Sequence, residues 1–390
     1  ALAAAGAAAG GGLALATGGS SPPADDPPVP AGGSGFRSGA TGARSLPEEP
    51  RSATERDQQR KADAKLPVPL SRAAARLFLV GFAGTTPSAP FFERLADREW
   101  GAVLIDGANV VDQAQLTALT GELGVVAKSA GQREPLVATR QLGGEEVAIP
   151  RIGPTAQPDI PNSAAARREA ETTGRSLRMR GFDLVLAPSG DLQVTGGPWA
   201  NRGFSDDPAE VARLVRGAID GWKRARIAPV LGHFPGEGTA SQDPELGVAT
   251  VGSSREELRT RDQVPFTVNA RTAPAMQMSG ALYAGFDGVT PATLDPAVVR
   301  TLRQSGFRGA VVSSNLTAVT LATGEGVGAA AVAALKAGCD MLYVPGDLND
   351  QEEAYRAVVK AVRDGRIPTS RVREALGRLD RLRAQTAPAG

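Results

Sequence analysis

Eight short apolar segments recur along the chain from residue 66 onward, and longer amphipathic segments separate most of them. The eight are Leu77–Phe82, Ala102–Ile105, Pro135–Arg140, Phe182–Ala187, Ile227–His233, Ala273–Ala281, Gly309–Ser314 and Asp340–Val344. Continuous apolar strands that alternate with helices are typical of a parallel sheet covered by helices. Eight such units predict an α/β fold, a single closed (β/α)8 TIM barrel over residues 65–386. A doubly wound open sheet is the alternative, but no Gly-rich phosphate loop follows the first segment.

The first 64 residues have a different composition. Residues 1–17 form an uncharged Ala/Gly/Leu run that resembles the apolar core of a signal peptide or signal anchor. We therefore expect export to an extracytoplasmic location, with membrane contact only through this segment; a flexible Ala/Gly tail is the alternative. Residues 18–64 are dominated by Gly, Ser, Pro and charge, which predicts a disordered linker.

Charge and the two rarest reactive residue types exclude several functions. The chain has 43 Lys+Arg and 42 Asp+Glu, a net charge of +1, so we expect no nucleic-acid partner. The single cysteine, Cys339, cannot form an intramolecular disulfide and lies in an apolar strand segment, which indicates a packed structural thiol. The single histidine, His233, excludes a multi-histidine metal site, and we expect neither a metal nor a cofactor.

In a TIM barrel the functional site lies at the carboxyl ends of the strands. Five stretches at or between these ends carry recognisable motifs. Segment 232–238 reads GHFPGEG, 201–208 reads NRGFSDDP, 141–144 reads QLGG, 306–316 reads GFRGAVVSSNL, and 337–342 reads AGCDML. The strand ends themselves are the positions at which we expect chemistry: residues 81–84, 106–109, 140–144, 188–191, 232–236, 281–283, 313–315 and 345–347.

These motifs resemble, in order and spacing from about residue 70 to 385, those of glycoside hydrolase family 3. The resemblance is to the single-domain bacterial β-N-acetylglucosaminidases that recycle cell-wall fragments. The family patterns are Lys-His-Phe-Pro-Gly-His-Gly, Arg-x-Phe-(Gly/Ser)-x-Asp-Pro, Asp-Gln-Glu-Gly-Gly and Gly-Phe-x-Gly-Val-Val-x-Ser-Asp-Asp-Leu. The resemblance implies a TIM barrel, a retaining β-N-acetylhexosaminidase ancestry and a site at the barrel mouth.

The departures from the family pattern lie at the positions that the resemblance assigns to catalysis. A retaining glycosidase needs a carboxylate nucleophile and a second group that protonates the leaving oxygen. The resemblance places the nucleophile at Ser314, with Asn315 next to it, where the family has two aspartates. A serine hydroxyl without an adjacent base is a poor nucleophile at neutral pH. It also lacks the negative charge that stabilises an oxocarbenium-like transition state.

The resemblance places the acid/base pair at Asp243 and Glu245, where the family has Asp and His. Glutamate can act as an acid/base if its pKa is tuned, so this change alone does not abolish activity. Among the positions that contact the sugar, Arg140 replaces an aspartate, Leu142 a glutamate and Glu145 an arginine. Gly232 replaces a lysine, whereas Arg202 and His233 are retained.

The residue types leave several roles open. His233 is either a packed structural histidine or a ligand contact, and Arg202 either pairs with Asp206 or Asp207 or contacts a ligand. Asp243 and Glu245 are either two solvated loop charges or part of the site. The ligand-binding candidates are Arg140, Glu145, Arg202, His233, Glu237 and Asn315.

Three functional hypotheses follow. The first is an exported, non-catalytic homologue that binds a glycan or peptidoglycan fragment, or a protein partner, at the cell envelope. The second is an active glycosidase with a rearranged site, in which Glu237 or Glu245 is the acid/base. The third is a structural scaffold barrel without a ligand. The substitution at Ser314 favours the first.

Overall fold

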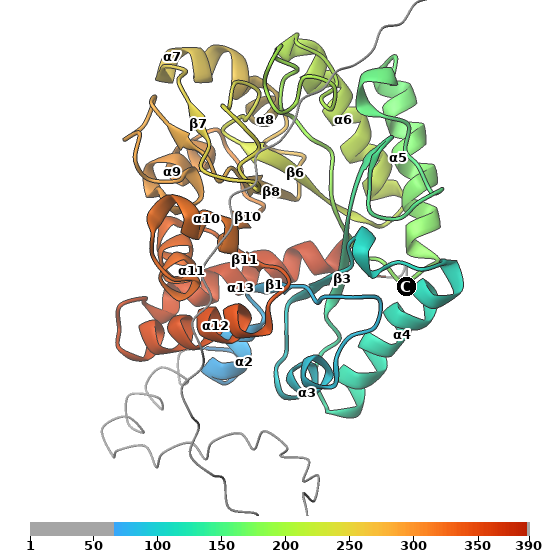
Figure 1. The fold of residues 1–390 in the computed structure, drawn as a ribbon, viewed down its shortest axis with the longest axis vertical. Helices are drawn as coiled ribbons and strands as arrows, with labels where there is room; N and C mark the ends of the chain where they lie inside the picture. The colour runs from blue at the N-terminus through green and yellow to red at the C-terminus, as the bar shows by residue number, and fades with distance from the viewer. Residues whose placement is uncertain (1–65, 388–390) are drawn as a thin grey trace, which may run out of the picture. The chain divides into compact units, whose positions relative to one another are not determined.

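All eight predicted segments form strands in the computed structural model, which describes residues 66–387 (Figure 1). The strands are β1 (Phe78–Val80), β2 (Ala102–Leu104), β3 (Leu136–Gly143), β5 (Leu184–Leu186), β6 (Ala228–Phe234), β8 (Ala275–Met278), β10 (Ala310–Asn315) and β11 (Met341–Val344). The predictions for residues 1–17 and 18–64, a signal-like segment and a linker, lie outside the described residues.

The eight strands close into a barrel. Their order is β2-β1-β11-β10-β8-β6-β5-β3, every neighbouring pair is parallel, and β3 pairs with β2 to complete the circle. The predicted (β/α)8 TIM barrel is therefore confirmed, and the open doubly wound alternative is wrong. Three two-residue strands lie outside the circle: β4 (Glu146–Val147) pairs antiparallel with β3, and β7 (Thr250–Val251) pairs with β9 (Leu282–Tyr283).

Helices surround the barrel between successive strands. They are α2 (Leu70–Ala75), α3 (Ala89–Asp97), α4 (Gln113–Ser129), α5 (Ser163–Arg178), α6 (Pro208–Arg224), α7 (Arg255–Glu257), α8 (Val264–Val268), α9 (Pro296–Gln304), α10 (Leu316–Thr323), α11 (Val327–Ala337), α12 (Leu348–Arg363) and α13 (Thr369–Ala384). Short helical turns are η1 (Gly107–Asn109), η2 (Gln157–Asp159), η3 (Leu258–Asp262) and η4 (Ala292–Leu294). Capping residues in the sequence determine where several helices begin. Asp207 and Asp347 accept hydrogen bonds from the first-turn N–H groups of α6 and α12.

No single helix within residues 66–387 is long and apolar enough to cross a membrane; α10 and α11 would qualify only as a pair, bent by 102° at their junction.

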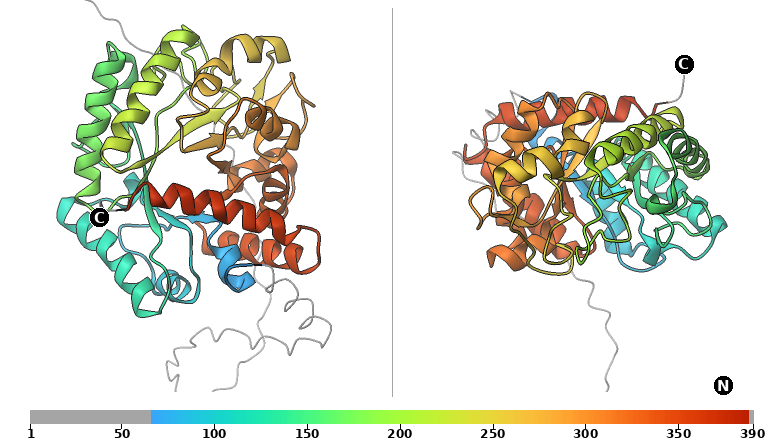
Figure 2. Two further views of the ribbon diagram at one scale, coloured as in Figure 1. Left: turned by 180° about the vertical axis from the view of Figure 1, so that it is seen from behind. Right: turned by 90° about the horizontal axis from the view of Figure 1, so that it is seen from above.

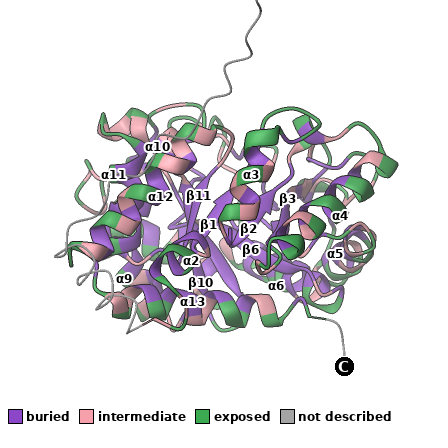
Figure 3. Ribbon diagram, turned by 90° about the horizontal axis from the view of Figure 1, so that it is seen from below, coloured by how far each residue is buried: buried purple, intermediate pink, exposed green. Residues whose placement is uncertain are grey.

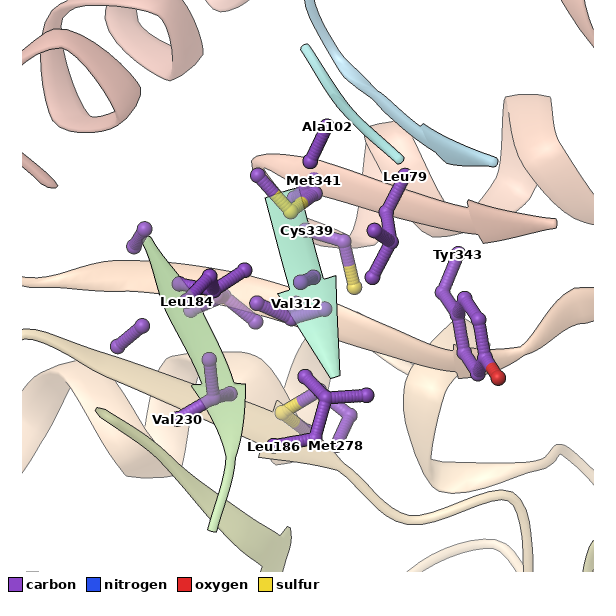
Figure 4. Close-up of a cluster of buried hydrophobic side chains, with 14 of the residues drawn as sticks. Leu79, Ala102, Leu184, Leu186, Val230, Met278, Val312, Cys339, Met341 and Tyr343 are labelled. Carbon is purple, nitrogen blue, oxygen red and sulfur yellow. The ribbon is translucent and has the colours of Figure 1, made fainter. Parts of the chain in front are cut away.

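Apolar side chains fill the barrel and the layer between strands and helices. Figure 3 shows the strands buried at the centre, with the exposed faces of the helices turned outward. The cluster in Figure 4 includes Leu79, Leu184 and Val312, which project from different strands. Cys339 belongs to this core and is fully buried, so it is the packed thiol that the sequence predicts, and burial raises its pKa to about 12.

Helix α13 lies across the amino-terminal end of the barrel, opposite the strand ends that carry the motifs (red in the rear view of Figure 2). Asp340, which precedes β11, is fully buried there and pairs with three guanidinium groups. The distances are 2.7 Å to Arg371 and 3.0 Å to Arg378 of α13, and 2.8 Å to Arg303 of α9. This cluster ties α13 and α9 to one strand through a single carboxylate.

Helices α5 and α6 approach each other closely at glycines of α6. A Cβ atom at Gly217 would lie 2.2 Å from the carbonyl oxygen of Ser163, and one at Gly221 would lie 2.2 Å from that of Arg167. Both contacts are with backbone, which cannot move aside cheaply, so only glycine fits here. The close approach lets Trp222 sit fully buried beside the helix pair.

Gly221→Ala is expected to lower the free energy of unfolding by about 1–3 kcal/mol, because the added methyl group forces the two helices apart. Gly121→Ala in α4 is the matched control, since a Cβ there meets nothing within 4 Å. That control should be neutral or stabilising by up to about 1 kcal/mol, from helix propensity. Urea unfolding of both variants measures the difference, and equal effects would refute the close-packing explanation.

Candidate functional site

The carboxyl ends of the strands surround a pocket of about 310 Å³. All nine site residues that the sequence indicated line it: Arg140, Glu145, Arg202, His233, Glu237, Asp243, Glu245, Ser314 and Asn315. They come from β3, β6, β10 and the loops that follow β3, β5 and β6. The shared location follows from the barrel, because parallel strands bring their carboxyl ends to one face.

Ser314 lies near the end of β10 with only 8% of its surface exposed. Its backbone N–H donates to Thr293 Oγ1 at 3.1 Å, which fixes the residue. Within the described part of the chain, its own Oγ has no hydrogen-bond partner. No base is therefore placed to take its proton. Asn315 uses its side-chain oxygen to accept from the backbone N–H groups of Thr317 and Ala318 and so caps α10.

Two ion pairs attach the loop after β6 to β3 and to the loop after β5. Glu245 Oε2 accepts from Arg140 Nη1 at 2.7 Å, and Asp243 Oδ2 accepts from Arg202 Nη1 at 3.0 Å. Arg140 also pairs with Asp106, which follows β2. The two loop carboxylates are thus paired rather than free in solvent. Burial raises the pKa of Asp243, but the Glu245 backbone N–H and the Arg202 guanidinium outweigh it, so the pKa falls below its ordinary value.

Arg202 does not pair with Asp206 or Asp207, as one sequence interpretation had it. Its two terminal nitrogens each lie 3.0 Å from a carboxylate, one from Asp243 and the other from Glu146. The sequence could not show this, because β4 is needed to bring Glu146 back beside β3. Asp207 instead caps α6.

His233 is held by the buried carboxylate of Asp191, which was not among the candidate site residues. Asp191 Oδ2 lies 2.9 Å from His233 Nδ1 and 3.1 Å from its backbone nitrogen. The same carboxylate accepts from Ser189 Oγ at 2.9 Å and from the Glu237 backbone N–H at 2.7 Å. Trp199 packs against the imidazole with ring centroids 5.3 Å apart. Asp191 therefore orients His233, which keeps 22% of its side chain exposed to the pocket.

The charges of His233 and Glu237 depend on each other. Burial lowers the pKa of His233, but the carboxylates of Glu237 and Asp191 outweigh it and raise the pKa to about 9. Burial raises the pKa of Glu237 to about 7, against the lowering effect of the His233 charge. His233 is consequently a cation at neutral pH, with Nδ1 donating to Asp191.

Asp191, His233 and Glu237 are also the one set of possible metal ligands found among residues 66–387, with ligand atoms within 4.8 Å of one another. The Asp191 carboxylate already accepts four hydrogen bonds, and Glu237 Oε2 lies 3.4 Å from Trp199 Nε1. A cation here would have to displace this network. The donors fit an internal hydrogen-bonded support better than a metal centre.

Aromatic side chains provide little surface for a sugar to stack on. Trp199, Phe204 and Tyr283 lie in or after strand-end segments, but of these three only Trp199 lines the pocket, and it is 3% exposed. The Arg202 guanidinium covers its ring at 4.3 Å. Phe204 and Tyr283 are 6% and 1% exposed and pack elsewhere. Polar groups therefore dominate the surface that a ligand would meet.

Comparison with known proteins agrees with this fold. Residues 72–382 match the family model described as the glycosyl hydrolase family 3 N terminal domain. The chain belongs to glycosyl hydrolase family 3. A β-hexosaminidase of Stenotrophomonas maltophilia (strain K279a) is 30% identical over 283 residues, which cover 69% of this chain and 83% of that protein.

Solved structures of the family superpose on the barrel. A family 3 β-N-acetylglucosaminidase from Paenibacillus sp. FPU-7 matches with a TM-score of 0.77 and 28% identity, and the match covers 82% of this chain and 64% of that one. A family 3 glycosyl hydrolase from Mycobacterium smegmatis matches with a TM-score of 0.73 and 26% identity, covering 81% and 97%. The chain is thus a β-hexosaminidase-like member of family 3.

Proposed function

We propose that this protein is a non-catalytic family 3 homologue that binds a saccharide, such as a fragment of an envelope glycan, in the barrel-mouth pocket. One observation carries the proposal: the residue at the nucleophile position is Ser314, and its hydroxyl has no hydrogen-bond partner among the described residues. Without a base the hydroxyl stays protonated, and it cannot supply the charge that a retaining mechanism requires.

The acid/base loop supports the same proposal. Glu245 is engaged by Arg140, whose Nη1 donates to Glu245 Oε2 at 2.7 Å. A general acid must reach the leaving oxygen of a substrate, so this ion pair opposes the role. The pocket itself remains large enough for a small ligand, since binding sites begin at about 300 Å³. These features fit retained binding better than a scaffold without a ligand. An extracytoplasmic location remains part of this proposal, based on the composition of residues 1–17.

One observation favours the second candidate, an active glycosidase. Glu237 faces the pocket with a pKa of about 7, which suits an acid/base at neutral pH. A retaining mechanism would still need a nucleophile, and an inverting one a second carboxylate free to activate water. Asp243 and Glu245 are both ion-paired. We therefore rank this candidate second.

We expect no release of 4-nitrophenol from 4-nitrophenyl N-acetyl-β-D-glucosaminide above the uncatalysed background, because neither half of the catalytic pair is available. Release that disappears in Ser314→Ala or Glu245→Gln, with the fold retained, would contradict the proposal. Release that disappears only in Glu237→Gln would establish the second candidate instead.

Binding is tested separately by thermal unfolding in the presence of solubilised peptidoglycan fragments and their constituent hexosamines. A ligand at 100 times its Kd stabilises the folded state by about 2.7 kcal/mol, so Tm should rise with a saturable dependence. Ala318→Trp should abolish the rise, because residue 318 lines the pocket. Leu321→Trp on the same helix is the control, since its side chain is 62% exposed and outside the pocket lining. No rise with any saccharide would contradict saccharide binding and would leave a scaffold barrel or a protein-binding homologue as the remaining hypotheses.

A further inference from the structure

The charges that line the pocket are unbalanced. Six lining residues are carboxylates: Asp106, Glu145, Glu146, Glu237, Asp243 and Glu245. The cationic groups in the same lining are Arg140, Arg202 and His233. Even with the imidazole protonated, the pocket carries a net negative charge. A low-dielectric cleft lined by one sign of charge concentrates ligands of the other sign.

Each guanidinium group is already paired with two protein carboxylates through its terminal nitrogens, and Arg202 Nε is buried without a hydrogen-bond partner among the described residues. Arg140 bridges Asp106 and Glu245, and Arg202 bridges Glu146 and Asp243. An anionic ligand would have to displace one of these internal partners, and it would meet the excess of carboxylates at the same time. The arrangement therefore disfavours a carboxylate- or phosphate-bearing ligand.

A second observation, independent of the charges, points to a ligand in this pocket. The Ser314 hydroxyl is more than nine-tenths buried, faces the pocket, and lacks a hydrogen-bond partner in the described structure. Buried polar groups are nearly always paired, so an unpaired one at a pocket wall marks a place for a polar group of a ligand. Gly280 stands beside it, and a Cβ there would lie 3.4 Å from Ser314 Oγ. The hydroxyl oxygen itself is buried, and the absence of a side chain at Gly280 leaves the space next to it unfilled.

We propose that the pocket takes a hexosamine whose amine is free and protonated, in preference to its N-acetylated form. This inference rests on the proposed function, that the site binds a saccharide, and it names the class. The pocket volume of about 310 Å³ suits a single sugar ring. The ammonium group meets the carboxylate excess, and the ring hydroxyls meet the Ser314 hydroxyl and the Gln277 amide, which also lines the pocket. Acetylation would remove the charge on which this preference depends.

His233 supplies a direct reporter, because it is the one histidine of the chain and lies in the pocket wall. With isotope-labelled histidine, its ring resonances are followed by NMR during titration with D-glucosamine, N-acetyl-D-glucosamine and D-glucose at pH 6.5. We expect glucosamine to bind at least tenfold more tightly than either neutral sugar. Its affinity should fall as salt is raised, because screening weakens the attraction.

Carboxylate variants, measured by calorimetry, test the cause of the preference. Glu145→Gln removes one pocket charge without breaking an Arg140 or Arg202 ion pair, and it should weaken glucosamine binding about threefold without affecting D-glucose. Glu122→Gln, on the exposed face of α4, is the control and should change nothing.

The outcomes distinguish a failure of the amine preference from a failure of the proposed function, saccharide binding. Binding of N-acetyl-D-glucosamine as tight as that of glucosamine, or tighter, overturns the amine preference and leaves saccharide binding intact. Glucosamine binding that is unaffected by Glu145→Gln and by salt also overturns it. No saturable shift of the His233 resonances with any of the three sugars overturns both.

Discussion

Asp340→Asn is expected to lower the free energy of unfolding by about 3–5 kcal/mol, the range for removing one partner of a buried ion pair. The substitution keeps the shape of the side chain and removes its charge. Three guanidinium groups, those of Arg303, Arg371 and Arg378, would then face one another without the carboxylate that separates their charges. The backbone N–H of Val311 would also lose an ionised acceptor at 3.0 Å.

Urea unfolding of wild type and variant, with the transition midpoint and slope both fitted, measures this effect. Asp380→Asn is the matched control in α13, because that carboxylate is 52% exposed and pairs with Arg133 at the surface. Surface pairs contribute about 1 kcal/mol or less, so the control should unfold nearly as wild type does. A loss no larger in Asp340→Asn than in the control would show that the cluster is not a stabilising element.

His233 is expected to titrate with a pKa of about 9, far above the ordinary value near 6.5. Because the folded-state pKa is raised, the resulting stabilisation is complete below pH 6.5 and is lost as pH rises through 9. The shift corresponds to about 3 kcal/mol at most, at about 1.4 kcal/mol per pKa unit. The pKa of Glu237 is also raised, to about 7. The stabilisation of the folded state that follows from this shift is therefore lost as pH rises from about 4.5 to 7.

The ring resonances of the one histidine give this pKa directly by NMR, without assignment of other signals. The linked stability is the difference in unfolding free energy between wild type and His233→Gln, measured from pH 6 to 10. That difference should shrink with rising pH. In Glu237→Gln the titration should move toward the ordinary value, because the neighbouring charge is gone. A His233 pKa near 6.5 in wild type would contradict the proposed network.

The barrel could be predicted from the sequence because its signal is local and repeated. A buried parallel strand such as β11 must be apolar on both faces, so Met341–Val344 reads as a strand without knowledge of its partners. The two-residue strands β4, β7 and β9 have no such pattern. Their backbone is extended because tertiary contacts hold it so, and a pair of residues is too short to carry a period.

The sequence indicated which residues line the pocket, but it could not indicate which of them form ion pairs with one another. Strand-end positions and family motifs indicated Arg140, Arg202 and Glu245, and the structure brings them to one pocket. The partner of Arg202 could not be predicted, since Glu146 is 56 residues away and Asp243 is 41 residues away in the sequence. Asp191 lies in a predicted strand-end stretch but was not among the candidate site residues, because an aspartate after Ser-Gly resembles an ordinary loop residue. Its importance depends on its complete burial beneath His233.

The Arg140–Glu245 pair couples two positions that are 105 residues apart in the sequence. Because Arg140 also pairs with Asp106, replacing Arg140 alone would leave two carboxylates of the pocket wall without their cation. Replacing Glu245 alone would leave Arg140 with one carboxylate partner and would detach the loop after β6 from β3. The effects of substitutions at Arg140 and Glu245 on stability are therefore expected to be non-additive. A change in what this pocket binds is thus expected to need coordinated substitutions at both positions.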